Sequence, residues 1–316
     1  MDDRTGSSGY DVVVVGAGAA GLNAALVLAR ARRRVAVVDA GEPRNAPSAH
    51  MQGFLSRDGM APAALLEVGR AEVAGYGAAL IEGRVERIEP GFTVHLVGGA
   101  ALSARRIVVA TGLRDELPDI PGVRERWGAD VLHCPYCHGY EVRDQPLAVL
   151  GFSPLAVHQA LLLRQWSDDV TLVSHTLVLS DEDHERLTAR GVRIVNGEIK
   201  RVVTDGGRVS GVELVDGRTV RRTAVFLFPH MVPNDGLLTG LGCETANGWV
   251  VTDPTGLTSV AGVWAVGNVV DPRAMVISSA GMGATAAFAI NAGLVDEDVD
   301  LAVERHRAES ARGVER

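Results

Sequence analysis

The 316-residue chain has little lysine, little cysteine and no excess of positive charge. Lys200 is the only lysine, so arginine supplies nearly all of the positive charge, which we attribute to coding bias. The formal net charge of -8 argues against a nucleic acid or an anionic membrane as the main partner. No tract is of low complexity, and the composition, 47% hydrophobic and 22% charged, is typical of a globular protein large enough for two domains.

An export signal is also missing from the expected place. The stretch "MDDRTGSSGYDVVVVG" carries acidic residues where a signal peptide is basic, and glycines cut its apolar run short. No apolar segment looks long enough to span a bilayer. We therefore expect a cytoplasmic protein without a membrane partner, in a compartment where structural disulfides are rare.

Two of the three cysteines, Cys134 and Cys137, form a C-x-x-C within "HCPYCHGYE", with His138 directly behind them. Taken alone, this stretch fits a c-type haem attachment site, a glutaredoxin-like dithiol, half a zinc site or the redox disulfide of a flavoenzyme. Cys243 stands apart, and we expect it to be a small buried residue.

The start of the chain predicts a dinucleotide-binding fold. "YDVVVVG" is suited to a buried parallel strand, and "GAGAAG" then places Gly16, Gly18 and Gly21 in G-x-G-x-x-G register, with Ala19–Ala20 between the last two. A helical segment and a second strand follow, and that strand ends in Asp39, close to the spacing of about 20 expected for a partner of a ribose hydroxyl. This motif does not decide between NAD and FAD.

Three later segments favour FAD over NAD, because they resemble segments of a known family. "IVVATGLRDELPDIPG" (107–122), "FLFPHMVPN" (226–234) and "GVWAVGNVVDPRAMVISSAGMGATAAFAI" (262–290), together with the position of "CPYC", make the chain similar to the low-molecular-weight thioredoxin reductase family. The resemblance implies an α/β fold with two Rossmann-like domains. An FAD domain would be built from 1–115 and 248–316, and an NAD(P)-type domain with the redox cysteines would occupy 116–247. It also implies further FAD contacts from Ala110, Thr111, Gly112, Gly267 and Asn268.

The expected second Rossmann unit is altered in its glycine turn. "QPLAVLGFSPLAVHQALLLRQW" keeps Gly151 and a small residue at Ala156. Ser153, however, replaces the glycine that lets the backbone approach a pyrophosphate, and Pro154 stiffens the turn.

The segment after the next strand is altered as well. Relatives that use NADPH have arginines there for the 2′-phosphate, whereas residues 174–176 are Ser-His-Thr. Neither His175 nor Arg164 replaces that arginine cluster. Two interpretations stay open: NADPH still binds weakly, or the domain survives as a scaffold for the cysteines.

This context favours the flavin-linked disulfide among the four kinds of site. Haem attachment normally requires export, glutaredoxins carry the motif near the start of a small domain, and a zinc site needs about four ligands. His133 and His138 lie too close to the cysteines in sequence to complete a tetrahedron, so we expect no metal. The resemblance implies that Cys137 reacts with the flavin and Cys134 with the substrate.

The residue after the second cysteine departs from the family pattern. Thioredoxin reductases place an aspartate there as a general acid, whereas this chain has His138. That variant resembles the branch that oxidises small-molecule dithiols in gliotoxin and holomycin biosynthesis, where a neutral imidazole suits proton removal from thiols. For His133 a capping or packing role is as plausible as a catalytic one, and Tyr136 is expected to pack beside the disulfide.

The sequence therefore predicts an FAD-dependent dithiol oxidase that forms an intramolecular disulfide in a secondary metabolite and passes electrons to O2. The alternatives are an NADPH- or ferredoxin-dependent thioredoxin reductase and, third, a non-catalytic flavin-binding redox sensor. A homodimer is expected because relatives form one.

Overall fold

The computed structural model describes residues 9–314. The acidic start of the chain, which carries part of the argument against an export signal, lies outside this range. Two compact units make up the chain. The first comprises Met1–Pro43, Ala63–Leu113 and Pro233–Arg316, and the second comprises Arg44–Pro62 and Arg114–Val232. The chain passes from the first unit to the second within β7 (Leu113–Glu116) and returns within β16 (His230–Pro233). These two strands pair with each other.

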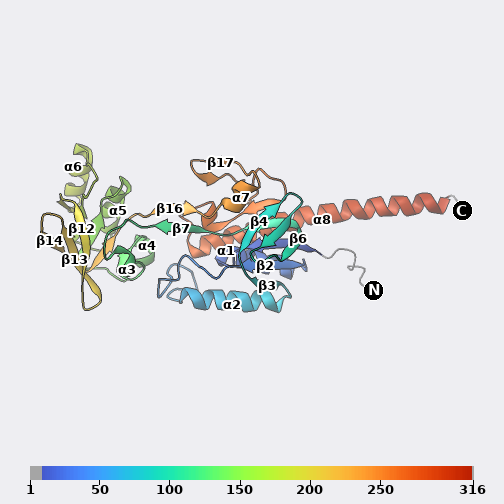
Figure 1. The fold of residues 1–316 in the computed structure, drawn as a ribbon, viewed down its shortest axis with the longest axis horizontal. Coiled ribbons are helices and arrows are strands. Elements are labelled where there is room, and N and C mark those ends of the chain that lie inside the picture. The colour runs from blue at the N-terminus through green and yellow to red at the C-terminus, as the bar shows by residue number, and fades with distance from the viewer. Residues whose placement is uncertain (1–8, 315–316) are drawn as a thin grey trace. The chain divides into compact units, whose positions relative to one another are not determined.

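The first unit is built on a sheet with strand order β3-β2-β1-β6-β5-β4, and β19 pairs with β6. Figure 1 labels β2, β3, β4 and β6 of this sheet. The strands β3, β2, β1, β6 and β19 run parallel, whereas β4, β5 and β6 form an antiparallel meander. The strands are β1 (Tyr10–Val15), β2 (Val35–Asp39), β3 (Ala79–Glu82), β4 (Val85–Glu89), β5 (Thr93–Leu96), β6 (Ala101–Val109) and β19 (Val263–Ala265). The other elements are α1 (Ala19–Arg30), α2 (Pro62–Gly75), α7 (Gly236–Gly240), β17 (Thr245–Ala246), β18 (Trp249–Val250), η1 (Gly267–Val269) and α8 (Val276–Val314).

The second unit has a five-stranded parallel sheet of order β11-β10-β9-β15-β8 and a separate antiparallel sheet, β12-β13-β14. Its strands are β8 (Val131–Leu132), β9 (Leu147–Leu150), β10 (Val170–Val173), β11 (Arg193–Val195), β12 (Ile199–Asp205), β13 (Arg208–Leu214), β14 (Thr219–Arg221) and β15 (Ala224–Phe226). Its helices are α3 (Val123–Arg126), α4 (Pro135–His138), α5 (Leu155–Leu163) and α6 (Asp181–Ala189). The prediction of an α/β fold with two Rossmann-type sheets is confirmed.

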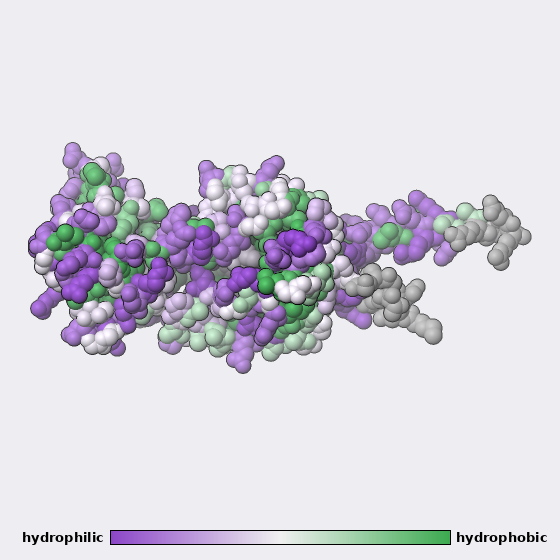
Figure 2. Space-filling view, in the orientation of Figure 1, coloured by the Kyte–Doolittle hydropathy of each residue, from purple (hydrophilic) through white to green (hydrophobic). Residues whose placement is uncertain are grey.

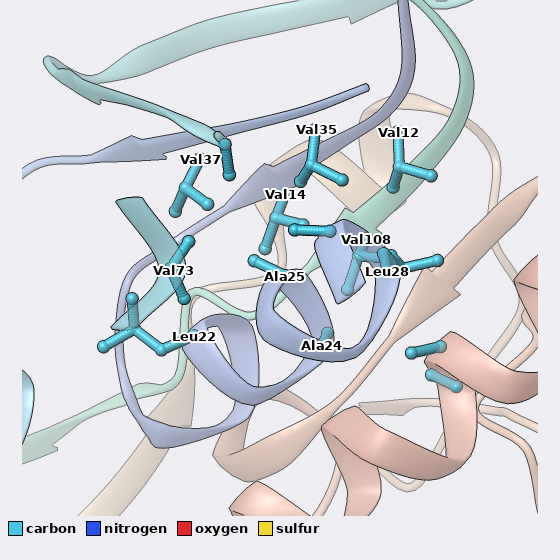
Figure 3. Packing of buried hydrophobic residues seen from close by; sticks show 14 of the residues in the cluster. Val12, Val14, Leu22, Ala24, Ala25, Leu28, Val35, Val37, Val73 and Val108 are labelled. Carbon is cyan, nitrogen blue, oxygen red and sulfur yellow. The ribbon is translucent and has the colours of Figure 1, made fainter. Parts of the chain in front are cut away.

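Small residues let α8 approach α1 closely in the first unit. Val12 and Val14 of β1 pack with the buried alanines of α1 in one core cluster (Figure 3). Helix α8 contributes Ala286, Ala287, Ile290 and Leu294 to the same cluster. A Cβ atom on Gly283 would lie 2.1 Å from the carbonyl oxygen of Ala20, so the backbone of α1 lies directly against α8. The alanine-rich composition of α1 therefore serves both helix formation and close packing.

The two units differ from the predicted domains at two places. The second sequence-based boundary lay at 247/248, whereas the unit changes between Val232 and Pro233. The reason is that Leu238, Cys243 and Val250 pack in the second core cluster of the first unit, beneath its sheet. The segment 44–62, expected in the FAD domain, groups instead with the second unit. Cys243 is 7% exposed, as expected of a small buried residue.

One helix corrects the statement that no segment is long enough to span a bilayer. Within Val276–Ala311, an 18-residue window has a mean hydropathy of 1.2, and 28% of that window is buried. By length and composition alone this helix could cross a membrane, but core helices of soluble proteins meet the same criterion. The apolar residues that α8 packs on α1 account for part of this hydropathy. Figure 2 shows that the projecting C-terminal part of α8 is mainly hydrophilic.

Candidate active site

The residues predicted to hold a dinucleotide gather at one edge of the first unit's sheet. Because β1, β2, β6 and β19 run parallel, their carboxyl ends share that edge. Gly16 follows β1, Asp39 ends β2, residues 110–112 follow β6, and Gly267 begins η1 after β19. The fold thus brings together positions from both ends of the chain.

The three motif glycines have different roles. Gly16 has a φ of +102°, and a Cβ atom there would lie 2.5 Å from the carbonyl oxygen of Ala110. A Cβ atom on Gly21 would lie 1.9 Å from the carbonyl oxygen of Gly16, so Gly21 allows helix and strand to pack. Gly18 has a φ of -72°, and no heavy atom lies within 4 Å of the place of its Cβ. The protein itself therefore has room for a side chain at Gly18.

Helix α1 begins directly after Gly18, with Ala19, Ala20 and Gly21 in its first turn. The first bond within the helix runs from the N–H of Leu22 to the carbonyl oxygen of Gly18, at 2.9 Å. The N–H groups before Leu22 have no partner within the helix and favour an anion such as a pyrophosphate.

Asp39 keeps acceptor capacity for a ribose hydroxyl. Its Oδ1 accepts from the backbone N–H of Ala17 at 3.1 Å, and its Oδ2 accepts from Arg70 at 2.7 Å. Each carboxylate oxygen can accept a second hydrogen bond. The pairing with Arg70 was not foreseen, because Arg70 lies on α2, well beyond the motif.

Asn234 holds the segment 110–112 in place. The hydroxyl of Thr111 donates to the carbonyl oxygen of Asn234 at 2.7 Å, and Nδ2 of Asn234 donates back to the carbonyl oxygen of Thr111 at 2.9 Å. The backbone N–H of Asn234 donates to Gly112. In the sequence Asn234 is only the last residue of the segment 226–234, and its role depends on this pairing with a residue distant along the chain.

Gly267 and Asn268 shape the start of the C-terminal block. Gly267 has a φ of +78°, and a Cβ atom there would lie 3.0 Å from the Cβ of Ala20. Nδ2 of Asn268 donates to the carbonyl oxygens of Asp271 and Ala274, at 2.9 and 3.0 Å. Asn268 thus orders the loop that leads into α8.

The second Rossmann turn keeps its packing glycine but has few amides to offer. A Cβ atom on Gly151 would lie 2.5 Å from the carbonyl oxygen of Ser174, so glycine is needed there. The N–H of Ala156 already donates to Ser153, and the N–H of Val157 donates to Pro154. Pro154 has no N–H to donate. The N-terminus of α5 is therefore a poor anion site compared with that of α1.

His175 and Arg164 are engaged elsewhere in the second unit. Nδ1 of His175 accepts from the N–H of Ile199 at 2.9 Å, and its ring lies edge-on to Phe152 with centroids 4.9 Å apart. Burial lowers the pKa of His175, which favours the uncharged ring at neutral pH. Arg164 forms an ion pair with Asp168. Neither side chain replaces the arginines that bind the 2′-phosphate of NADPH in relatives.

The redox motif lies on a tight strand-to-helix turn. Cys134 caps α4, and its carbonyl oxygen accepts from the N–H groups of Cys137 and His138, both at 3.2 Å. The two cysteines are half-buried free thiols, so the structure corresponds to the reduced dithiol. Tyr136 is 66% exposed, and its ring lies edge-on to Trp166, so it packs less than expected.

The two thiols differ in acidity. A hydrogen bond from the Cys137 thiol, opposed by burial and aided by the N–H groups of Cys137 and Tyr136, lowers the pKa of Cys134 to about 7. The same thiol–thiol bond, together with burial and the neighbouring Cys134 charge, raises the pKa of Cys137. In the reduced pair near neutral pH, Cys134 therefore carries the thiolate and Cys137 keeps its proton.

The two histidines beside the cysteines are mostly buried. Burial lowers the pKa of His138 against the opposing charge of Glu141, so its imidazole is neutral at pH 7 and able to accept a proton. Burial also lowers the pKa of His133. The Nδ1 of His133 lies 3.4 Å from the carbonyl oxygen of Leu227, and its ring meets Phe228 edge-on. Within residues 9–314, no group of three or more His, Cys, Asp or Glu side chains could hold a metal ion.

Arg44 is a residue near the dithiol that sequence analysis missed. Its guanidinium pairs with both carboxylate oxygens of Asp115, at 2.8 and 2.7 Å, and its charge helps to lower the pKa of Cys134. A Cβ atom on Gly128 would lie 2.8 Å from the Cβ atom of Pro47, so within the second unit the segment 44–62 packs closely against residue 128. No local pattern marks Arg44, because its partners lie far along the chain.

Comparison with known proteins identifies the family. A model of pyridine nucleotide-disulphide oxidoreductases matches residues 10–286. The chain belongs to this family. Thioredoxin reductase sirT of Leptosphaeria maculans is 30% identical over 308 residues, covering 89% of this chain and 93% of that protein.

Solved structures of this family agree with the fold. The crystal structure of HlmI is 68% identical, with a TM-score of 0.93 over 96% of this chain and 98% of that one. A putative thioredoxin reductase TrxB from Bacillus anthracis is 32% identical, with a TM-score of 0.87 over 91% of this chain and 99% of that one. The protein is thus a flavin-dependent oxidoreductase of the thioredoxin reductase type.

FAD is the cofactor of such proteins, and the first unit fits it. The amides of the first turn of α1 suit the pyrophosphate, the open space over Gly18 lets it approach, and Asp39 has acceptor capacity for a ribose. No comparable opening exists at Gly16 or Gly21, where a Cβ atom would meet backbone.

The open space over Gly18 leads to a specific prediction. Gly18→Ala is expected to fold with an unchanged thermal midpoint in the absence of FAD, because its φ of -72° and free surroundings tolerate a methyl group. FAD affinity should fall by about tenfold or more, since the methyl group would meet the pyrophosphate. Isothermal titration of the apoprotein measures this. Gly75→Ala, on α2 with nothing within 4 Å, is the control. Unchanged FAD affinity in Gly18→Ala would contradict this location for the pyrophosphate.

Proposed function

We propose that the protein is a dithiol oxidase that closes an intramolecular disulfide in a small secondary metabolite, with O2 as the electron acceptor. The observation that carries the proposal is the altered second Rossmann turn. Ala156 and Val157 bond within that turn, Pro154 has no N–H, and His175 is held by Ile199. A nicotinamide dinucleotide has few anchors in this turn, so substrate thiols are the better source of electrons. The proposal includes a cytoplasmic homodimer, as the sequence led us to expect.

The neutral imidazole of His138 supports the same direction of electron flow. An aspartate at this position would suit proton delivery to a leaving thiolate, whereas a histidine with a lowered pKa suits proton removal from an incoming thiol. The second candidate is an NADPH- or ferredoxin-dependent thioredoxin reductase. It is favoured by the name of the relative sirT, which is called a thioredoxin reductase.

The side chains define a sequence of exchange steps from the oxidised pair. A substrate thiolate, whose proton has gone to solvent, attacks the sulfur of Cys134, the Cys134–Cys137 bond breaks, and Cys137 leaves as a thiolate that takes up a proton from solvent. The second substrate thiol gives its proton to His138 and attacks the substrate sulfur of the mixed disulfide. Cys134 then leaves as a thiolate, stabilised by the N–H groups of Tyr136 and Cys137. A low leaving-group pKa speeds this second step.

The balance of the reaction is one dithiol plus one O2 to one disulfide plus one H2O2. Bound FAD supplies the two-electron carrier between the reduced cysteine pair and O2. The protein side chains supply exchange, proton acceptance and stabilisation of the Cys134 thiolate.

Turnover in air tests the proposal. With dithiothreitol as the dithiol, the holoenzyme is expected to form one H2O2 for each cyclic disulfide, followed by a peroxidase-coupled assay and by chromatography. With NADPH and oxidised thioredoxin, no comparable turnover is expected. NADPH-driven reduction of thioredoxin without peroxide would favour the second candidate instead.

His138→Asn should lower kcat/KM in this assay by about a hundredfold, the usual scale for loss of a general base. Because burial lowers the pKa of His138, the wild-type base is neutral at pH 7, and its rate should fall only at a pH below the range in which an ordinary histidine titrates. The variant should lack that acidic limb. His158→Asn, exposed on α5, is the matched control. An unchanged acidic limb in His138→Asn would remove the base role.

A further inference from the structure

Gln159 is a polar side chain on the buried face of α5. It is 1% exposed, among the apolar side chains of the second unit's core. Its Nε2 donates to the carbonyl oxygen of His133 at 2.6 Å, and its Oε1 is buried without a hydrogen-bond partner among the described residues. Turning the amide over would place Oε1 against the His133 carbonyl oxygen, so this one bond fixes the orientation of the side chain.

Fold stability alone is a weak reason for a glutamine here. Nε2 satisfies the carbonyl oxygen of His133, but the buried Oε1 without a partner destabilises the native state, so the two effects oppose each other. Residues that are costly to stability and oriented toward a reactive group are characteristic of functional sites. The carbonyl that Gln159 holds belongs to the residue directly before Cys134.

The turn between β8 and α4 consists of His133 and Cys134 alone. The peptide that joins these two residues therefore sets where the Cys134 sulfur lies relative to the N–H groups of Tyr136 and Cys137, both of which bond to that sulfur. Helix α5 packs against α4, so Gln159 anchors this turn from the core side. The contact of the His133 ring with Leu227 is longer, at 3.4 Å, and holds the side chain rather than the backbone.

We propose that Gln159 is a positioning residue for the redox dithiol. Its carboxamide holds the carbonyl of His133 and thereby keeps the Cys134 sulfur at the start of α4, against the amides that stabilise its thiolate. The proposal concerns the thiol itself and holds for either direction of electron flow. Its test can therefore fail without affecting the proposed function, and the reverse is also true.

The test is the rate at which iodoacetamide alkylates Cys134 in the reduced, FAD-containing enzyme, measured by mass spectrometry from pH 5 to 9 under anaerobic conditions. Gln159→Met should lower the rate at pH 7 by about fivefold, the scale of one hydrogen bond. Its thermal midpoint should change little, because the variant removes the unpaired Oε1 but also leaves the His133 carbonyl oxygen without its donor. Gln165→Met, exposed just after α5, should change neither quantity.

Gln159→Glu gives a readout that a purely structural role would not produce. A protonated carboxyl can still donate to the His133 carbonyl, so alkylation should match the wild type at the acidic end. As the pH rises and the carboxyl ionises, the donor is lost and a negative charge appears, so the rate should fall progressively below that of the wild type. The other charged or titratable groups near the dithiol are unchanged: His133, His138, Glu141, Arg44 and Asp115.

The proposal is overturned if Gln159→Met keeps the wild-type alkylation rate at every pH. It is also overturned if that variant loses rate only in proportion to lost FAD or folded protein. If Gln159→Met does not fold, the proposal depends on Gln159→Glu, and a curve parallel to the wild type across the whole pH range would overturn it.

Discussion

Anaerobic mixing with excess NADPH is expected to leave the flavin oxidised on the timescale of turnover, whereas dithiothreitol should bleach it. The reason lies in the second unit, where Ser153 and Pro154 replace the open pyrophosphate turn and no arginine follows β10 before α6. A charge-assisted contact is typically worth about 1.5–3 kcal/mol, so the loss of two weakens NADPH binding by roughly two to four decades. Stopped-flow absorbance of the flavin measures both reactions.

Readmission of air should restore the flavin colour and release peroxide in step with the substrate disulfide. A gain-of-function variant makes the test sharper. Ser153→Gly combined with Thr176→Arg restores a glycine in the turn and an arginine on an exposed position after β10, and should speed reduction by NADPH. Thr188→Arg, exposed on α6, adds the same charge as a control. Rapid bleaching of the wild type by NADPH, followed by efficient reduction of thioredoxin, would instead establish a reductase.

The parts of the site that sequence analysis predicted depend on local order along the chain. Gly16, Gly18 and Gly21 follow a buried strand, open a helix and precede Asp39, and each step of this pattern has a local steric or electrostatic cause. The defects at Ser153 and Pro154 were visible for the same reason. The structure adds that the N–H groups of Ala156 and Val157 already donate to carbonyl oxygens of the same turn.

The residues that were missed act through partners distant in sequence. Arg44 reaches the dithiol through a segment that groups with the second unit, Asn234 braces residues 110–112, and Gln159 holds the backbone before Cys134. None of these contacts has a characteristic spacing. The change of unit falls at 232/233 rather than at the predicted 247/248 for a related reason, because the apolar residues of α7 have no periodic pattern that shows which core they join.

Gln159 also shows why a single buried polar residue in an apolar helix is hard to interpret from sequence. In "LAVHQALLL" it could lie on the exposed face, and only the packing of α5 on the sheet places it inside. In the core, the buried Oε1 of Gln159 has no hydrogen-bond partner among the described residues, which is unusual for a core residue.

Substitution of the two redox cysteines should abolish turnover in two distinguishable ways. Cys137→Ser should leave Cys134 able to react with thiol reagents near pH 7 but break the link to the flavin, so dithiothreitol no longer bleaches it. Cys134→Ser should remove the low-pKa thiol that exchanges with substrate, so neither bleaching nor a mixed disulfide with substrate is expected. Both sites are half-buried, and serine is close in size, so FAD content should stay unchanged.

Cys243→Ser is the control for these variants, because Cys243 is buried in the first unit beside Thr258 and takes no part in the exchange. It should retain wild-type flavin bleaching, with at most a loss of thermal stability. Trapping with a radiolabelled dithiol, followed by mass spectrometry, shows which sulfur forms the mixed disulfide. Normal dithiol oxidation by Cys134→Ser, or a substrate adduct on Cys137 in the wild type, would reverse the roles assigned to the two cysteines. In that case the more acidic thiol, Cys134, would react with the flavin, and Cys137 would react with the substrate.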